Sequence, residues 1–247
     1  MITLKAEWEI EKMRRAGALT AQARDYVAAL VRPGVTTREL DDAARRFIEE
    51  RGGTPSFLGY EGFPASICAS VNSVVVHGIP DGQVLRDGDI VSLDLGVIVD
   101  GYHGDTATTV AVGEVPPDMR ALLAATRQAL LAGVAQAVPG NHLSDISHAV
   151  EEVGERAGFS IVVDFVGHGI GREMHEDPQV PNYGPPGRGI QLRRGMVLAI
   201  EPMINMGGPD VRIRDDGWTV ETIDGRPSAH FEHTVAVGAP PDVLTAP

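Results

Sequence analysis

The sequence contains a single cysteine, Cys68, among its 247 residues. One cysteine cannot form an internal disulfide, and a metal site built from four thiolates is excluded as well. An unpaired thiol is typical of proteins that stay in a reducing compartment. We therefore expect the protein to reside in the cytoplasm.

Long apolar runs and an excess of basic charge are also missing. No segment approaches the length of a membrane span, and the charged N-terminus, MITLKAEWEIEKMRRAG, lacks the apolar centre of a secretion signal. The formal net charge of −13 argues against general binding of nucleic acid, which requires a positive surface. We expect neither a membrane nor a nucleic acid as a partner. The acidic excess is also compatible with carboxylates gathered for metal.

The first quarter of the chain predicts two helices. An amphipathic stretch from about Ala6 to Val31 ends before Pro33-Gly34, a pair that commonly follows a helix. Thr36 begins the second helix, with Glu39 three positions later in a capping-box pattern. That helix ends at Gly52-Gly53.

The same order of signals returns 106 residues later. A helix that begins near Asp118 ends at Pro139-Gly140, and LSDISHAVEEVGERAG follows. Four positions match at this offset: Glu39 with Asp145, Leu40 with Ile146, Ala43 with Ala149, and Gly52 with Gly158. The constant offset indicates a duplicated unit of two helices followed by strands. We predict a single domain over residues 1–247, with halves of roughly 1–113 and 114–247.

Two aspartates occupy neighbouring strands of a predicted hairpin. DIVSLDLGVIVDGYHGDTATTVAVG has two β-rich runs joined by Asp100-Gly101, a dipeptide favoured in two-residue hairpin loops. This loop pairs Asp94 with Ala107 and makes Asp105 the diagonal neighbour of Asp94, roughly 7–8 Å away on the same face. Two acids that point inward from apolar strands are costly without a cation. The alternative is two unrelated acids, one of them in a turn.

The second half supplies further candidate ligands. Glu201 ends the apolar strand in GMVLAIEPMIN, and Glu232 is expected in the middle of a strand that follows a hairpin at Asp224-Gly225. The complete set is Asp94, Asp105, His168, Glu201 and Glu232. Four carboxylates around one divalent ion would leave about two negative charges buried, whereas two ions neutralise them. Oxygen-rich ligation with one imidazole suits Mn, Fe or Co better than structural zinc, and two bridged ions fit a hydrolytic site.

Seven segments in this order resemble the type I methionine aminopeptidases, which form subfamily A of peptidase family M24. They are SVVVHGIPD, LDLG, YHGDTA, GHGIG, MHEDPQVPNYG, AIEPM and FEHTVAV, and they span almost the whole chain. The resemblance implies an α+β pita-bread fold, in which two pseudo-symmetric αβ halves with antiparallel sheet enclose a dinuclear metal site. That fold agrees with the internal repeat.

The resemblance implies a role for each candidate ligand. Asp105 and Glu232 would bridge two divalent ions (Co, Mn, Fe, Zn or Ni), Asp94 would hold one ion, and His168 with Glu201 the other. The expected enzyme, a methionyl aminopeptidase, removes the N-terminal methionine from nascent proteins and peptides when the next residue is small and uncharged. Hydroxide activated by the two metals would attack the first peptide bond, with Glu201 transferring the proton.

Two further histidines resemble substrate-binding residues of the family. His175 would hydrogen-bond the scissile carbonyl, and His77 would lie near the substrate's amide nitrogen. The remaining histidines are expected to have structural roles, because imidazole has many ordinary hydrogen-bonding uses. They are His103, His142, His148, His230 and His233.

The resemblance also implies a methionine pocket and a second cation site. The pocket would be lined by Tyr60, Phe63, Cys68, Met174 and Trp218, with Phe57 close by. Met174 replaces the phenylalanine common in the family, and Phe57 stands where many bacterial members have cysteine; plain core packing is the alternative for Phe57. Asn72, Val74 and Ser228 match a Na⁺ or K⁺ site of some relatives, in which backbone carbonyls act as ligands.

Two other readings compete with this one. Prolidases and aminopeptidase P share the fold and a similar ligand set, but they normally carry an additional N-terminal domain, for which the chain has no room. Non-catalytic pita-bread binding modules have lost ligands, whereas all five are present here. The expected partners are N-terminal methionine peptides and nascent chains, with transient ribosome association but no Cys/His-rich docking module, and the expected state is a monomer.

Overall fold

The computed structural model describes residues 2–246 and has the predicted α+β composition. The α-helices of this part are α1 (Glu7–Leu30), α2 (Thr37–Glu49), α3 (Pro117–Ala135) and α4 (Leu143–Arg156), and a 3₁₀ helix spans Tyr60–Gly62. The strands up to the middle of the chain are β1 (Thr54–Pro55), β2 (Ile67–Val71), β3 (Val74–Val76), β4 (Ile90–Val99), β5 (Tyr102–Ala111), β6 (Ser160–Ile161) and β7 (Gly167–Gly169). The later strands are β8 (Glu176–Val180), β9 (Val197–Ile200), β10 (Met203–Asn205), β11 (Val211–Ile213), β12 (Val220–Thr222), β13 (Ser228–His230), β14 (His233–Ala236) and β15 (Asp242–Val243).

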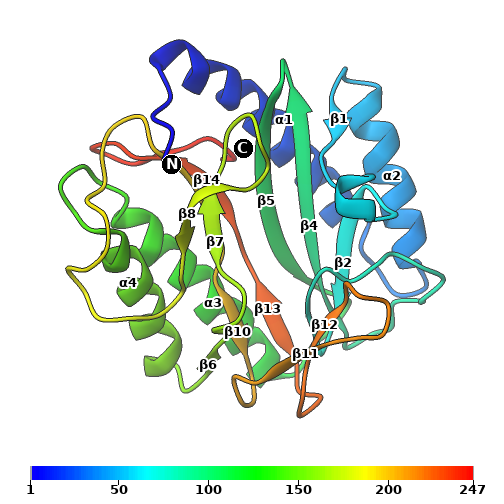
Figure 1. Cartoon of the computed structure of the whole chain (residues 1–247). Coiled ribbons are helices and arrows are strands. Elements are labelled where there is room, and N and C mark those ends of the chain that lie inside the picture. The colour runs from blue at the N-terminus through cyan, green and yellow to red at the C-terminus, as the bar shows by residue number, and fades with distance from the viewer. Residues whose placement is uncertain (1, 247) are drawn as a thin grey trace.

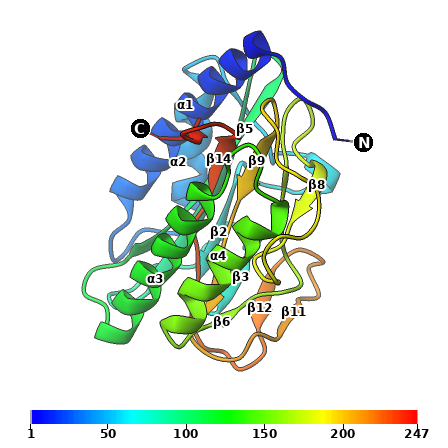
Figure 2. The same cartoon turned by 90° about the vertical axis from the view of Figure 1, so that its left-hand side faces the viewer.

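The helices lie on one side of the strands, and β8, β11 and β12 lie on the opposite side (Figures 1 and 2). Helices α1 and α2 pack on β2 and β4, where Leu40, Leu93 and Leu95 are fully buried or nearly so. Helices α3 and α4 pack on each other and on strands of the second half, around Ile146 and Leu198. Each helix pair thus covers its own apolar core. Within residues 2–246, no helix combines the length and apolar character needed to cross a membrane.

The predicted helix starts are present in both copies. The Thr36 hydroxyl accepts a hydrogen bond from the Glu39 N–H, and the Glu39 carboxylate accepts one from the Thr36 N–H at 2.7 Å. In the second copy the Asp145 carboxylate accepts the N–H of His142 at 2.6 Å. These contacts satisfy backbone donors that have no partner inside the first helical turn.

The hairpin that carries the two aspartates is confirmed. Strands β4 and β5 pair with Asp94 opposite Ala107 and Gly96 opposite Asp105. Asp100 and Gly101 both have positive φ, 52° and 75°. Two such residues in succession form the tight turn that matches the twist of paired strands.

Two expectations about the second half are wrong. Asp224-Gly225 is a turn but not a hairpin loop, because β12 pairs with β11 and β3 whereas β13 pairs with β10. Glu232 is not inside a strand; it lies in the gap between β13 and β14. Its N–H donates to the Ala107 carbonyl of β5 at 2.9 Å, so this segment leaves the ladder with β9 and β10.

The register on both sides of this gap is continuous. Met203 pairs with His230, and Ile200 pairs with His233. The positions between them, Glu201 and Glu232, therefore lie opposite each other in an interrupted antiparallel pair. Pro202 contributes to the interruption, because proline has no N–H to donate to a ladder.

Threonine side chains join β5 to the second half. The Thr234 hydroxyl accepts the Asp105 N–H at 2.9 Å and donates to the Asp105 carbonyl at 2.8 Å. The Thr106 hydroxyl donates to the Glu232 carbonyl, and the Thr109 hydroxyl to the His230 carbonyl, both at 2.8 Å. This seam fixes the backbones of Asp105 and Glu232 relative to each other.

Thr234→Val should destabilise the protein by about 2–4 kcal/mol, because it leaves both buried backbone groups of Asp105 without a partner. Valine keeps the shape of threonine, so the loss measures the hydrogen bonds. Thr234→Ser retains the hydroxyl and is the control, with a much smaller loss. Urea unfolding of the two variants is the measurement, and equal losses would contradict a seam held by the hydroxyl.

Candidate metal centre and active site

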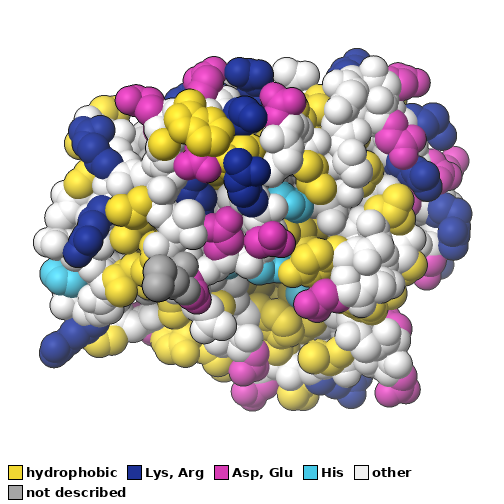
Figure 3. Space-filling view, turned by 45° about the horizontal axis from the view of Figure 1, so that its top comes forward, with side chains coloured by type: hydrophobic (Ala, Val, Ile, Leu, Met, Phe, Trp, Pro, Cys, Tyr) yellow, Lys and Arg dark blue, Asp and Glu magenta, His cyan; other side chains and the backbone are white. Residues whose placement is uncertain are grey.

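The five candidate ligands meet in one cavity of about 350 Å³. Asp94 comes from β4, Asp105 from β5 and His168 from β7, while Glu201 follows β9 and Glu232 precedes β14. Both halves of the chain therefore contribute. Figure 3 shows histidine side chains deep in a hollow of this face, with hydrophobic and acidic side chains around it.

His168 presents one ring nitrogen to the acids. Its Nδ1 lies 2.8 Å from the carbonyl oxygen of Gly169, which can only accept, so Nδ1 carries the proton. Its Nε2 lies 3.5 Å from Glu201 Oε1 and 3.9 Å from Asp105 Oδ2. Burial lowers the pKa of His168 to about 3. The ring is thus neutral at neutral pH, with the Nε2 lone pair free to bind a metal.

Glycines on both sides of His168 allow its strand to lie against its neighbours. A Cβ at Gly167 would fall 2.3 Å from the Ala199 carbonyl oxygen, and one at Gly169 would fall 2.2 Å from that of Asp177. Neither position has room for a side chain. This close approach is the reason for the glycine-rich sequence around the histidine.

Buried carboxylate oxygens in the cavity lack hydrogen-bond partners among residues 2–246. They are Asp94 Oδ1, Asp105 Oδ1 and Glu232 Oε1. One ligand atom each from Asp105, His168 and Glu232 lies within 4.8 Å of the others. Buried acceptors without donors are costly, whereas a cation at this spacing satisfies them. The donor set therefore fits divalent metal.

The carboxyl groups raise one another's pKa values. Burial, and then the Glu201 carboxylate, raises the pKa of Asp94 to about 7, against the opposing effect of His230. Burial raises the pKa of Glu201 to about 8. Burial and the neighbouring acids also place the pKa values of Asp105 and Glu232 well above the usual range. Without a cation, these groups hold protons near neutral pH.

His77 and His175 line the same cavity. The chain turns back after β7, so the His175 ring lies 4.3 Å from the His168 ring, and Tyr60 Oη lies 2.8 Å from His175 Nδ1. His77 has a positive φ of 58°, which is unusual for a residue with a side chain. Backbone strain of this kind concentrates at functional sites.

The predicted pocket residues form one apolar cluster beside the acids. Phe57, Phe63, Cys68 and Met174 are buried together, and Tyr60, Ile79 and Trp218 pack against them. The Phe63 and Trp218 rings meet edge to face at 5.1 Å. Sequence reasoning missed Ile79, which directly follows the HG pair of the quoted His77 segment, and Glu61, which lines the cavity.

His230 differs from the other histidines that were expected to be structural. His103 Nδ1 lies 2.9 Å from Ser56 Oγ, and His233 Nδ1 lies 2.9 Å from Thr245 Oγ1, so both have ordinary partners. His230 Nε2 is buried without a hydrogen-bond partner in the described chain, 3.6 Å from Glu201 Oε2. It belongs to the wall of the site. Its place before FEHTV in the sequence was the signal for this.

The predicted monovalent-cation residues are brought together in part. The Ser228 N–H donates to the Asn72 carbonyl at 2.9 Å, and β13 contacts β3, which begins with Val74. The Asn72 amide itself bonds to Asp89 Oδ1 and the Ile90 N–H. Its side chain is therefore used within the fold, which leaves backbone oxygens as the available ligands.

The raised pKa values predict how pH affects the metal-free protein. Above about pH 6.5, buried histidines still contribute with the opposite sign, because their folded pKa values are lowered whereas unfolded histidines titrate near 6.5; the prediction therefore concerns two carboxyl groups alone. Asp94 and Glu201, with folded pKa values of about 7 and about 8, then bind more protons than their unfolded counterparts, whose pKa values are near 3.8 and 4.5. The contribution of these two groups to the free energy of unfolding should therefore fall by about 2 kcal/mol between pH 6.5 and 8.

Thermal unfolding of the chelator-treated protein across this range is the measurement. The carboxyl contribution is fully present below the unfolded pKa values and is lost as pH rises through the folded ones. Asp94→Asn combined with Glu201→Gln removes these two groups and leaves the histidines, Asp105 and Glu232 in place. The difference in free energy of unfolding between the wild-type chain and this variant should fall by about 2 kcal/mol from pH 6.5 to 8, and a difference that does not change with pH would contradict the assignment.

The comparisons with known proteins agree with this geometry. Residues 11–239 match the sequence profile of metallopeptidase family M24. The chain is 52% identical over 246 residues to a methionine aminopeptidase of Clostridium perfringens, covering 99% of each sequence. The crystal structure of methionine aminopeptidase from Rickettsia prowazekii superimposes with a TM-score of 0.98 at 42% identity, with complete coverage of both chains.

A prolidase from Pyrococcus furiosus shares the fold at lower similarity. It superimposes with a TM-score of 0.77 at 21% sequence identity, and this chain covers 65% of its length. The likeness shows the fold alone. The fold expectation of two αβ halves around the site, the pita-bread architecture, is confirmed by the structural relatives. The chain belongs to metallopeptidase family M24.

Proposed function

We propose that the chain is a methionine aminopeptidase, which removes the first residue of a peptide when that residue is methionine and the next one is small and uncharged. The observation that carries this proposal is the position of the ligand cluster beside an apolar cluster that lines the same cavity. The pocket matches one unbranched apolar side chain in chemistry, and the relatives at about 50% identity over the full chain are methionine aminopeptidases. We take the whole chain to be one catalytic domain made of two pseudo-symmetric halves.

Divalent metal is held by the buried donor set. We infer that Asp105 and Glu232 would be shared between two ions, with Asp94 completing one site and His168 with Glu201 the other. Four carboxylates balance two divalent charges, and oxygen-rich ligation suits Mn, Fe, Co, Ni or Zn in an open site. When bound, such ions lower the pKa of water and polarise a carbonyl group.

Glu201 is the residue that we expect to transfer a proton from the attacking water. It follows the apolar strand β9, and its carboxylate lies within the cavity, where it can accept a proton from water and release it again. It lies 3.5 Å from His168 Nε2 and 3.6 Å from His230 Nε2, at the centre of the polar wall. We infer that it takes a proton from the attacking water and delivers it to the leaving amine.

His77 and His175 would contact the substrate peptide bond. Burial lowers the pKa of His77 to about 4, so its ring is neutral and can hydrogen-bond the peptide without a charge. The Tyr60 hydroxyl orients the His175 ring through Nδ1, which leaves Nε2 for the carbonyl oxygen. A donor aimed at that oxygen stabilises the negative charge that develops on it during attack.

The pocket would select methionine through soft apolar contacts. Aromatic rings and sulfur atoms interact favourably with a thioether, and Phe63, Trp218 and Met174 supply both. Burial raises the pKa of Cys68 well above the usual value, so its thiol stays protonated and acts as an apolar wall. The free amine of the substrate would lie at the ligand cluster, where four acids favour a positive or metal-bound nitrogen.

The proposed monovalent-cation site would use the backbone of Asn72, Val74 and Ser228. Asn205 supports it, because it pairs with Ser228 and its buried Oδ1 has no partner within residues 2–246. A Na⁺ or K⁺ ion is a suitable partner for such oxygens.

The substrate prediction tests the proposed function. The chain should cleave Met-Ala-Ser and should leave N-acetyl-Met-Ala-Ser intact, because acetylation removes the amine that meets the ligand cluster. Ala-Pro and Gly-Pro dipeptides, the substrates of a prolidase-like enzyme, should also remain intact. Comparable turnover of free and acetylated peptide would refute this geometry, and turnover of the proline dipeptides alone would favour the prolidase reading.

Substitution of His168 and substitution of His175, the two histidines of the glycine-rich segment, should reduce activity in different ways. His168→Ala should lower bound metal and activity together, and added metal should restore part of the activity. His175→Ala should keep its metal and lose kcat by about 10²–10³-fold, as expected for one lost oxyanion donor. Elemental analysis and steady-state kinetics are the measurements. Equal metal content in both variants would contradict the division of roles.

A further inference from the structure

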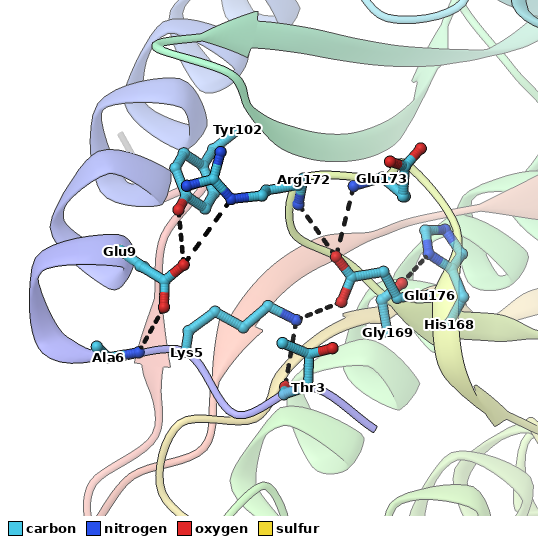
Figure 4. A network of polar contacts seen from close by, with 10 residues as sticks. All are labelled: Thr3, Lys5, Ala6, Glu9, Tyr102, His168, Gly169, Arg172, Glu173 and Glu176. Atoms are coloured by element: carbon cyan, nitrogen blue, oxygen red, sulfur yellow. Dashed lines mark hydrogen bonds and ion pairs between the residues drawn. The ribbon is translucent and has the colours of Figure 1, made fainter. Parts of the chain in front are cut away.

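The loop that carries Met174 and His175 has little secondary structure of its own. Residues 171–175 form bends between β7 and β8, with one backbone bond inside the loop, from the Gly171 N–H to the Glu173 carbonyl at 3.1 Å, and one to β5, from the His103 N–H to the Gly171 carbonyl at 2.9 Å. A side chain supplies hydrogen bonds that the backbone of this loop lacks. The Glu176 carboxylate accepts the N–H of Arg172 at 3.0 Å and that of Glu173 at 3.4 Å (Figure 4).

This carboxylate is itself held by the N-terminal segment. Lys5 Nζ lies 2.6 Å from Glu176 Oε2, and the two side chains are only 4% and 15% exposed. The Lys5 N–H donates to the Gly195 carbonyl at 2.7 Å, so the lysine backbone is fixed as well. Lys5 and Glu176 are 171 positions apart in sequence. The pair therefore anchors the loop to a distant part of the chain.

The Lys5–Glu176 pair is tightly packed against the loop. A Cβ at Gly171 would fall 2.4 Å from Glu176 Oε1 and 2.6 Å from Lys5 Cε. A tightly packed, buried ion pair keeps its geometry, and removal of one partner leaves an uncompensated buried charge. A second contact on the same loop is weaker, because Arg172 reaches Glu9 only at 4.0 Å and is 59% exposed.

We propose that Lys5 is a positioning residue for the active site, which acts through Glu176 to hold Met174 in the pocket and His175 against the scissile carbonyl. The inference rests on the role given to His175 above. The expected effect follows from geometry, because a displacement of about 1 Å in a substrate-contacting group can cost up to about 100-fold in rate.

The test is a double-mutant cycle of Lys5 and His175 with Met-Ala-Ser as substrate. Lys5→Met should lower kcat by about 10- to 100-fold with metal content unchanged. In the His175→Ala background, the same substitution should lower kcat by less than about threefold, because His175 is already gone and a displaced Met174 affects substrate binding, and thus KM, rather than kcat. Losses that multiply, or a Lys5→Met enzyme with normal kcat, would overturn the proposal.

Arg14→Met is the matched control. Arg14 also joins the first helix to a distant acid, Asp242, at 2.5 Å, but this pair is 44% and 40% exposed and does not touch the loop. Its loss should leave kcat within about twofold of the wild-type value. If Lys5→Met does not fold, the cycle is run with Glu176→Gln, which keeps an oxygen for the loop amides but weakens the hold on the ammonium. The criteria are the same, with an expected loss of about 3- to 10-fold.

A readout independent of activity separates this proposal from the proposed function. The ¹³C-methyl resonance of Met174 should shift or broaden in Lys5→Met and stay unchanged in Arg14→Met. An unchanged resonance in Lys5→Met would overturn the positioning role, whatever the reaction. A His175→Ala enzyme with normal kcat would instead overturn the role of His175, while the Met174 resonance still reports on the loop.

Discussion

The burial of four carboxyl groups within one small cavity is the constraint on which the rest of this structure depends. Burial makes the charged form of these groups costly, and it raises the pKa of Asp94, together with the Glu201 carboxylate, to about 7 and that of Glu201 to about 8. Folding therefore brings together groups that repel one another unless a cation is present. The sequence tolerates this arrangement because divalent metal binds to the folded chain and offsets the repulsion.

The strands hold these acids close together despite their mutual repulsion. Asp105 and Glu232 come from different halves, and their backbones are joined by the hydroxyls of Thr106 and Thr234. The paired strands of the second half open at Glu201 and Glu232, so both side chains leave the regular alternation of a ladder and reach the cavity. Regular pairing elsewhere supplies the rigidity that holds this break in place.

His175, which lines the cavity beside the acids, is positioned by contacts of a different kind. His175 lies on a segment without regular hydrogen bonding, oriented by Tyr60 and supported by the carboxylate of Glu176. Precision at such a site comes from side chains that lock one another, because the backbone alone leaves the loop several conformations. The N-terminal segment becomes part of the active-site support through Lys5.

The amino-acid sequence by itself determined the structural elements that depend on residues close together in the chain. Helix starts follow from capping residues such as Thr36, and the Asp100-Gly101 loop set the register that places Asp94 and Asp105 on one face. It also identified the five candidate ligands that the cavity brings together; for Asp94 and Asp105 the reason is that acids inside apolar strands are costly unless they hold a cation.

Only the tertiary structure decided how segments distant in sequence meet. The Asp224-Gly225 turn looks like a hairpin loop locally, but its two strands join different sheets because each finds a better partner elsewhere. Glu232 leaves its strand where its N–H bonds to Ala107, and His230, which pairs with Met203 in β10, comes within 3.6 Å of Glu201. The pairing of Lys5 with Glu176 has no local signal at all. Contacts of this kind depend on the packing of the whole chain, which residue patterns a few positions long do not encode.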